Sequence, residues 1–214
     1  MAKSENKIII PAITEKTMAI TIIGESDLIL NKMNKRTIED LTDERKDKGK
    51  KIREVNPWED AITAIHWRDP LPKDIEYTEE TLKELLTNNA PCISAFGLQK
   101  SLCQAVVRNG IDTYSTKFDA CVNISAPNNL IPIRFHEHFI DEKLMSPQKG
   151  RPVLVRLNRF TGWTADVTIR YLEGGTYGLE QIVQIIQLAG FGLGIGSGRS
   201  SGYGRYSVSP EVIA

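Results

Sequence analysis

The sequence predicts an α+β fold whose core elements follow the order strand, helix, strand, strand, helix, strand. Alternating runs rich in β-branched residues predict the strands, and two runs with apolar residues at helical spacing predict the helices. A glycine-rich segment, 187–208, follows the second helical run and holds seven of the chain's 16 glycines. The expected core elements are 17–24, 94–108, 152–159, 163–171, 178–189 and 204–208.

Each core element has its own local signals. The first strand, TMAITIIG at 17–24, alternates in side-chain character and ends at a glycine. The first helix, 94–108, begins with a serine that can cap its free amide groups, and Gly110 follows its end. The second helix, 178–189, carries apolar residues along one face, and the strand 204–208 follows the glycine-rich segment.

Hairpins are expected in two places. The runs 152–159 and 163–171 alternate and are separated by the sequence FTG, which predicts a tight turn. The runs 117–125 and 130–135 alternate on either side of APNN, which predicts a second turn of the same kind.

This order of core elements is that of a ferredoxin-like, or RRM-like, βαββαβ arrangement. The segments at about 31–90 and 112–150 are then insertions into a single domain of residues 1–214. Within the first insertion, EETLKELL at 79–86 predicts a short amphipathic helix, and 58–68 fits either a helix or a strand.

The composition is that of an ordinary globular protein, with 41% hydrophobic and 25% charged residues among 214. The net charge is +0, so an anionic partner must be attracted by a local patch. The three cysteines, Cys92, Cys103 and Cys121, have no CxxC spacing, which favours a reducing compartment over a disulfide framework or a zinc knuckle. We find no signal-peptide pattern and no apolar run long enough to span a bilayer, so we expect a cytoplasmic protein without a membrane partner.

A basic arm is expected after the first strand. The segment 31–57 is dominated by charged residues, and within 45–53 six residues are basic and one is acidic. A solvated flexible excursion and a nucleic-acid contact arm are both consistent with this composition. The arm residues expected to contact nucleic acid are Arg45, Lys46, Lys48, Lys50, Lys51 and Arg53.

The glycine-rich segment ends in SGRSSGYGR, which combines backbone freedom with arginine and serine side chains. Glycines let amide groups and guanidinium groups come close to a phosphate. No GxxxxGK[ST] motif is present, and GFGLGIG follows a helix rather than a strand, which excludes a dinucleotide-binding fingerprint. Close packing is the alternative role for the glycines, and it accounts best for Gly190, Gly192 and Gly194. The residues expected to bind phosphate are Gly196, Ser197, Gly198, Arg199, Ser200, Ser201, Gly202, Tyr203 and Arg205.

The histidines do not form a recognisable catalytic or metal-binding set. His136 and His138, in RFHEHF, would face the same side of an extended segment, but a metal site needs further ligands that the sequence does not name. Single histidines can act as general bases in metal-independent RNA cleavage, so His66 and His138 are the candidates for that alternative. We expect no metal, no cofactor and no catalytic residue.

The helix, the glycine-rich segment ending in RSSGYGRY and the final strand together resemble the RAMP superfamily, the RNA-binding proteins of CRISPR effector backbones. The resemblance implies a ferredoxin-like core with a glycine-rich loop between the last helix and the last strand. A weaker similarity, to the family's P-x-S-S-L-K-G-x-x-R segment, rests on Pro91, Ser94, Leu98, Lys100, Ser101 and Arg108. On this similarity, Lys100 is added to the expected phosphate-binding residues.

The chain also resembles a group of small phage and prophage proteins with no settled activity. The similarity covers most of the chain and is sharpest over 163–206, where the group has W-x-A-x-V-x-I-R-Y and later W-R-P and G-R-F. Arg199 matches the arginine of W-R-P, and Arg205 matches that of G-R-F. The chain has Ser197-Gly198 where the group has Glu-Trp, so the tryptophan of the group is missing here. Tyr203 is then the aromatic side chain next to the two arginines in the sequence.

These features predict a non-enzymatic nucleic-acid-binding protein of phage or prophage type. Its glycine-rich loop would hold backbone phosphates of a single strand while the basic arm closes over that strand. Assembly into a homo-oligomer is expected by analogy with RAMP subunits. One alternative is a counter-defence protein in the host cytoplasm that sequesters a nucleotide second messenger or mimics a CRISPR subunit. The other is a metal-independent ribonuclease.

Overall fold

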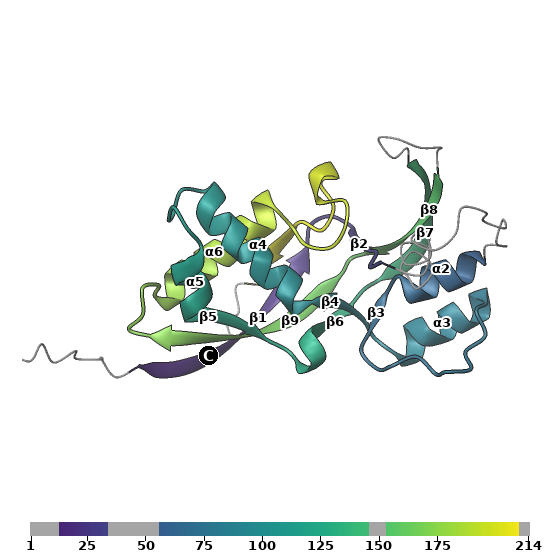
Figure 1. The fold of residues 1–214 in the computed structure, drawn as a ribbon, viewed down its shortest axis with the longest axis horizontal. Helices are drawn as coiled ribbons and strands as arrows, with labels where there is room; N and C mark the ends of the chain where they lie inside the picture. The colour runs from purple at the N-terminus through teal and green to yellow at the C-terminus, as the bar shows by residue number, and fades with distance from the viewer. Residues whose placement is uncertain (1–12, 34–55, 146–152, 210–214) are drawn as a thin grey trace, which may run out of the picture.

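The computed structural model describes residues 13–33, 56–145 and 153–209. Within them, helices are combined with antiparallel sheets, as in an α+β fold (Figure 1). The strands are β1 (Thr14–Gly24), β2 (Leu28–Leu30), β3 (His66–Trp67), β4 (Pro91–Ser94), β5 (Val122–Ser125), β6 (Leu130–Arg134), β7 (Glu137–Met145), β8 (Val153–Thr161), β9 (Thr164–Glu173) and β10 (Tyr206–Val208). The helices are α2 (Pro57–Thr63), α3 (Glu79–Asn88), α4 (Ala95–Arg108), α5 (Thr116–Cys121) and α6 (Leu179–Gly192), with the short 3₁₀ helices η1 (Pro127–Asn129) and η2 (Arg199–Ser201).

Seven of the described strands form the main sheet, in the order β10-β1-β9-β6-β4-β3, with β5 also paired to β9. At its centre, β1 pairs with β9 from Thr14 opposite Glu173 to Ile23 opposite Thr164. β5 and β6 lie one after the other along β9, because η1 separates them and they pair with different parts of that strand. The sheet thereby places β10, which follows the glycine-rich segment, directly beside β1.

One face of this sheet is covered by α4, α5 and α6 (Figure 1). Alternate residues of β1 and β9 are buried, as expected for strands with one face in the core. They pack in one cluster with the apolar stripes of α4 and α6. Buried members of this cluster are Met18, Ile20, Ile22, Ala165, Val167, Ile169, Leu98, Leu102, Ile182 and Ile186. Because strand side chains alternate between faces, a slip of one residue in β1 or β9 would expose its whole apolar row.

β2, β8 and β7 form a second sheet near α2 and α3 (Figure 1). The fully buried Asn158 of β8 links this sheet to the helices, since its Nδ2 donates to the carbonyl oxygen of Ala61 at 2.9 Å. Its Oδ1 lies 3.0 Å from Nε2 of His138 on β7. A buried carboxamide is tolerated when its polar atoms have partners, so Asn158 fixes how β8 sits on α2.

The expected hairpin of 152–159 with 163–171 is wrong. β8 pairs with β2 and β7, whereas β9 pairs with β1, β5 and β6. Between them, Gly162 has a positive φ of 54° and Trp163 is fully buried, with its indole N–H donating to the carbonyl oxygen of Ser26 at 2.8 Å. Because this tryptophan is anchored in the core, the chain passes from one sheet to the other instead of folding back. β5 and β6 take the place beside β9 that the sequence predicted for 152–159.

The expected hairpin of 117–125 with 130–135 is also wrong. The beginning of the first run forms α5, and β5 and β6 pair with β9 rather than with each other. The turn between them folds into η1, where the Asn129 side chain accepts a hydrogen bond from the Phe96 amide at 2.8 Å. The same side chain donates to Oγ of Ser94 at 3.3 Å. This turn therefore caps α4 rather than closing a hairpin.

The helices expected at 94–108, 178–189 and 79–86 are confirmed as α4, α6 and α3. The segment 58–68, which fitted either a helix or a strand, contains one of each: most of α2, followed by the short strand β3. The basic arm at 45–53 lies outside the described residues. Among the helices of the described part, none is long and apolar enough to cross a membrane.

Candidate functional site

The loop between α6 and β10 is fixed by hydrogen bonds from three elements. The Gly204 amide donates to the Asp27 carbonyl oxygen at 2.8 Å, and the Ser197 amide donates to the Ile29 carbonyl oxygen at 2.9 Å. From α4, the fully buried Ser101 donates through Oγ to the carbonyl oxygen of Gly194 at 2.9 Å. The loop therefore has a defined conformation without any ligand, which lowers the entropic cost of binding one.

Four glycines of this region, Gly190, Gly194, Gly196 and Gly204, are required by close packing, because a Cβ on any of them would lie less than 3.0 Å from a backbone oxygen. A Cβ on Gly190 would lie 2.0 Å from the carbonyl oxygen of Tyr206, and a Cβ on Gly204, whose φ is 70°, would lie 1.9 Å from that of Ile195. Gly192 is different, because a Cβ there would meet no atom within 4 Å. The packing role that the sequence predicts for Gly192 is therefore wrong, and that residue faces open space.

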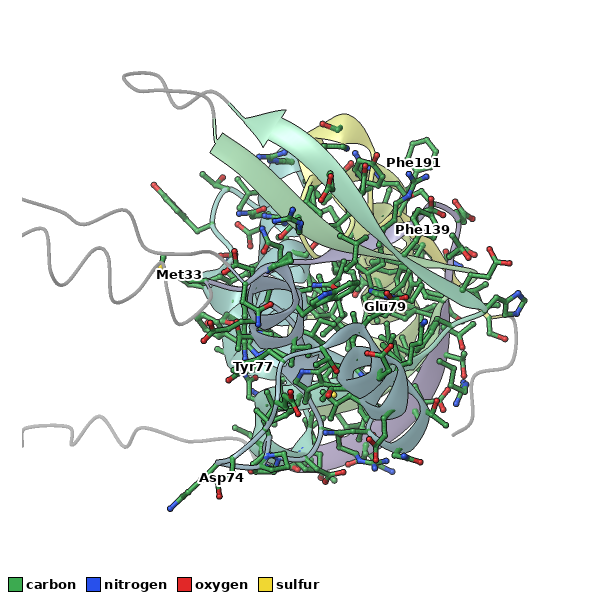
Figure 2. The ribbon with its side chains drawn as sticks, turned by 90° about the vertical axis from the view of Figure 1, so that its right-hand side faces the viewer. Met33, Asp74, Tyr77, Glu79, Phe139 and Phe191 are labelled. Carbon is green, nitrogen blue, oxygen red and sulfur yellow. The ribbon has the colours of Figure 1, made fainter. Side chains whose placement is uncertain are left out.

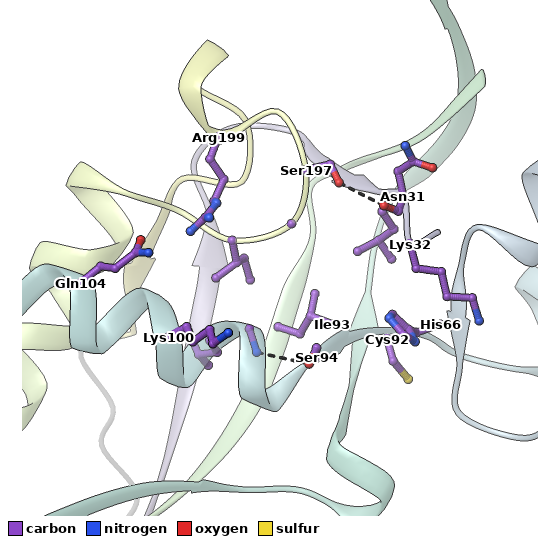
Figure 3. A pocket seen from close by; sticks show the side chains of 15 residues that line it. Asn31, Lys32, His66, Cys92, Ile93, Ser94, Lys100, Gln104, Ser197 and Arg199 are labelled. Carbon is purple, nitrogen blue, oxygen red and sulfur yellow. Dashed lines mark hydrogen bonds between the residues drawn. The ribbon is translucent and has the colours of Figure 1, made fainter. Parts of the chain in front are cut away.

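A pocket of about 260 Å³ lies between this loop, α4 and the residues that follow β2 (Figure 3). We call it the mixed pocket, because apolar and polar side chains both line it. Its lining residues are Leu30, Asn31, Lys32, His66, Cys92, Ile93, Ser94, Gly97, Leu98, Lys100, Gln104, Ile195, Gly196, Ser197 and Arg199.

A second pocket, of about 340 Å³, adjoins the first. We call it the arginine pocket, and its lining residues are Gln104, Arg108, Gly192, Leu193, Arg199, Ser200 and Arg205. Gln104 and Arg199 line both pockets, so the two form one continuous surface between α4 and the loop. We refer to this surface as the groove.

The groove carries an excess of positive charge. Its cationic residues are Lys32, Lys100, Arg108, Arg199 and Arg205. The described residues that line it include no aspartate or glutamate, and none of the five cations has an ion pair within the described part of the chain. In a protein with a net charge of +0, this local excess is a patch that can attract an anion.

Arg205 is the most constrained of these cations. Its Nη2 lies 3.4 Å from the carbonyl oxygen of Arg199, and its Nη1 is buried without a hydrogen-bond partner in the described structure. A buried donor without an acceptor is destabilising, so an oxygen of a bound anion would relieve that cost. Arg205 is thus a cation of the groove with a hydrogen-bond donor that the described structure leaves unsatisfied.

His66 and Lys32 lie together in the mixed pocket (Figure 3). Burial lowers the pKa of the Lys32 amine from its usual value. Burial, and then the charge of Lys32, lower the pKa of His66 below its usual 6.5. The His66 imidazole is therefore mostly neutral at pH 7, with one nitrogen able to donate and the other to accept.

The beginning of α4 is already occupied by protein groups. Oγ of Ser94 accepts a hydrogen bond from the Gly97 amide at 3.2 Å, and the side chain of Asn129 accepts one from the Phe96 amide at 2.8 Å. The contribution of α4 to the groove therefore comes from its side chains rather than from free amide groups.

The structure brings together six of the ten expected phosphate-binding residues. Those that line the groove are Gly196, Ser197, Arg199, Ser200, Arg205 and Lys100. Those that do not are Gly198, Ser201, Gly202 and Tyr203. Tyr203 turns toward the second sheet, where its hydroxyl accepts a hydrogen bond from Lys143 at 3.2 Å and its ring lies under Lys143 and Arg159.

Among the groove residues that the sequence did not predict to bind phosphate, the polar side chains Asn31, Lys32, His66, Gln104 and Arg108 matter most for a ligand. A signal for two of them was present. Lys100, Gln104 and Arg108 are four residues apart, which places them on one face of a helix that the sequence does predict. Asn31 and Lys32 had no such signal, because β2 brings them to the groove through tertiary contacts.

His136 and His138 do not form a pair. His136 lies at a bend before β7, and His138 packs on Phe160 with ring centroids 4.8 Å apart and bonds Asn158. Burial lowers the pKa of His138, which keeps this imidazole neutral. Among the described residues, no group of three or more histidine, cysteine, aspartate or glutamate side chains could hold a metal ion.

Exposed aromatic side chains lie elsewhere on the surface. Phe139 and Phe191 are both exposed, and Figure 2 shows them on the outside of the molecule. Arg159 covers the Phe139 ring at 4.9 Å, and Lys100 covers the Phe96 ring at 4.4 Å. No aromatic residue lines the groove within the described structure apart from His66, so the described lining offers no tyrosine, tryptophan or phenylalanine ring on which a ligand could stack.

Comparison with known proteins found no matching family model and no matching curated protein. Among solved structures, the chain is similar to a chain in a cryo-EM structure of the type III-B Cmr-β bound to cognate target RNA, with a TM-score of 0.47 and 10% identity. The match covers 93% of this chain and 61% of that one, so the chain spans less than two thirds of its length. A similarity of this size assigns no function, and the function of the groove has to be argued from its own residues.

Proposed function

We propose that the protein binds single-stranded nucleic acid and that the groove holds the backbone phosphates. The observation that carries the proposal is a set of five cations around two adjoining pockets, none of which has a carboxylate partner among the described residues. Arg108, Arg199 and Arg205 converge on the arginine pocket, where guanidinium groups can each bind two phosphate oxygens. Ser200, at the rim, adds a hydroxyl donor of the kind often found on phosphates.

The core that supports this groove is proposed to be ferredoxin-like. The sheet order β10-β1-β9-β5 follows the split-βαβ arrangement when β5 and β6 together serve as its second strand. In this frame α4 and α6 are the two core helices, and the groove lies where the first helix meets the loop after the second. The resemblance to RAMP proteins noted in the sequence supports the same arrangement.

The experiment is a titration of the full chain with labelled single-stranded RNA and DNA across a salt series. If the three arginines of the arginine pocket each contact one phosphate, the plot of log affinity against log salt should have a slope of about −2. Absence of binding at low salt, or binding that does not change with salt, would contradict the proposal.

Capture of a small nucleotide is the second candidate function, and the mixed pocket favours it. That pocket has a partly apolar wall, unlike the arginine pocket beside it. Tight binding of a mononucleotide or cyclic dinucleotide that resists salt, with weak binding of longer strands, would support this candidate over the first.

A further inference from the structure

The mixed pocket has an inner wall that backbone phosphates do not require. Leu30, Ile93, Leu98 and Ile195 line it, and each is almost fully buried, with exposed fractions between 2% and 6%. Apolar walls favour a flat, weakly hydrated group over a charged one. The arginine pocket lacks such a wall, since Leu193 is the one large apolar side chain among its described lining residues.

The volume of the mixed pocket suits one small ring system. Its 260 Å³ lies just below the range of about 300–1,000 Å³ that is typical of pockets for drug-sized ligands. One nucleobase with part of its sugar is therefore a better match than two bases.

The polar groups at this pocket can recognise the edge of a base. The carboxamides of Asn31 and Gln104 make no side-chain hydrogen bond within the described residues, and each offers donors and an acceptor. The neutral imidazole of His66 adds one donor and one acceptor. Unpaired bases are commonly bound in this way, by hydrogen bonds to their exposed edges.

Arg199 connects the two pockets. It lines both, and in Figure 3 its side chain points from the loop toward α4, between Gln104 and Ser197. We propose that the mixed pocket holds the base of one nucleotide and that Arg199 binds the phosphate of that nucleotide at the boundary. The proposal rests on the proposed function of the arginine pocket and adds a base-recognition subsite to it.

The test uses Gly97→Leu, which places a side chain at the pocket while leaving every cation in place. A Cβ at Gly97 would meet only the Ser94 side chain, at 3.5 and 3.8 Å, which is ordinary contact. Leucine also favours a helix more than glycine does, so the variant should fold. Val107→Leu is the matched control, because Val107 lies exposed on the same helix and lines neither pocket.

Affinities are measured for an oligouridylate, an abasic strand of the same length, the four ribonucleoside monophosphates and ribose 5-phosphate. The wild type should prefer each base-containing ligand to its abasic counterpart by about tenfold, the size expected for one bound base. Gly97→Leu should remove this preference without weakening the abasic ligands, and Val107→Leu should keep it. If the monophosphates bind as tightly as the oligouridylate strand, the bound base belongs to a free nucleotide. If the strand binds much more tightly than the monophosphates, the bound base belongs to a nucleic acid.

Two outcomes separate a failure of this subsite from a failure of the groove. If Gly97→Leu retains the full preference for bases while Arg199→Ala weakens all ligands, the base subsite is wrong and the phosphate groove stands. If Arg199→Ala leaves every affinity unchanged, the proposed function itself is wrong.

Discussion

Arginines of the sheet and arginines of the groove have opposite surroundings. On the sheet, Arg134 pairs with Asp166 at 2.6 Å and Arg170 pairs with Glu15 at 2.5 Å, each across neighbouring strands. In the groove, Arg199 and Arg205 have no carboxylate partner among the described residues. The same side chain is therefore neutralised by the protein in one region and left available to a ligand in the other. A count of charges along the chain cannot make this distinction.

The largest effect on RNA affinity is expected when the two arginines of the loop are removed. Arg199→Ala combined with Arg205→Ala should weaken binding of single-stranded RNA by about 100-fold or more, because hydrogen bonds to charged groups contribute about 1.5–3 kcal/mol each. The salt slope should also become shallower by about one unit or more. Both quantities are measured by fluorescence anisotropy.

The matched control for this pair is Arg134→Ala combined with Arg170→Ala. It removes the same number of positive charges, but from residues whose partners are Asp166 and Glu15. Its affinity should stay within about twofold of the wild type, since exposed ion pairs contribute little. Equal losses in the two double variants would show that overall charge, not the groove, drives binding. Arg199→Ala alone keeps the test valid if the loss of Arg205 affects folding.

The second prediction compares two glycines of the C-terminal region. Gly204→Ala should lower the free energy of unfolding by about 2 kcal/mol or more, because alanine is strained at a positive φ and would clash with the Ile195 carbonyl group. Gly192→Ala should be neutral or stabilising by up to about 1 kcal/mol, since it lies in α6 beside open space. Chemical denaturation measures both, and equal destabilisation would contradict the packing difference between them.

The third prediction concerns pH and the charges of the mixed pocket. The pKa of His66 is lowered in the folded protein, so the unfolded chain binds a proton more readily. The stability that depends on neutral His66 is complete above a pH of about 6.5, the unfolded pKa, and is lost as the pH falls from there through the lower pKa of the folded state. His66→Gln should therefore show a smaller fall in melting temperature between pH 7.5 and 5.5, values spanning the ordinary histidine pKa of about 6.5. Bound phosphate should also reduce the fall in melting temperature of the wild type, because it supplies an anion and the described lining of the groove has none. An unchanged pH dependence in the variant would contradict this account.

The smallest expected effect concerns Tyr203. Tyr203→Phe removes the hydrogen bond from Lys143 but keeps the ring beneath Lys143 and Arg159. Stability should fall by less than about 1 kcal/mol, and RNA affinity should stay within about twofold, since this side chain faces the second sheet. A large loss of affinity would return Tyr203 to the binding surface that the sequence predicted for it.

Much of the fold could be predicted from local patterns. The periodicity of α4 and α6 and the alternation of β1 and β9 identified these elements, because each buries one face in the same core. Strand pairing could not be predicted in this way. β8 and β9 are separated by two residues, yet the burial of Trp163 places them in different sheets.

The candidate site was predicted in part, for a similar reason. The residues of the loop were found because arginine, serine and glycine stand close together in the chain. Asn31, Lys32 and His66 were missed because they reach the groove from β2 and β3, far from the loop in sequence. Arg108 lies one helical turn beyond Gln104, so its place on the groove face of α4 could have been inferred.

The sequence by itself determined the elements of this protein and the chemical character of its glycine-rich segment, since both depend on neighbouring residues. Only the tertiary structure decided which arginines are paired with a carboxylate within the described part of the chain. Asp166 and Glu15 neutralise the arginines of the sheet across strand pairs that no local pattern specifies. The groove keeps its cations because α4, β2 and the loop bring five of them together without a carboxylate among the described lining residues.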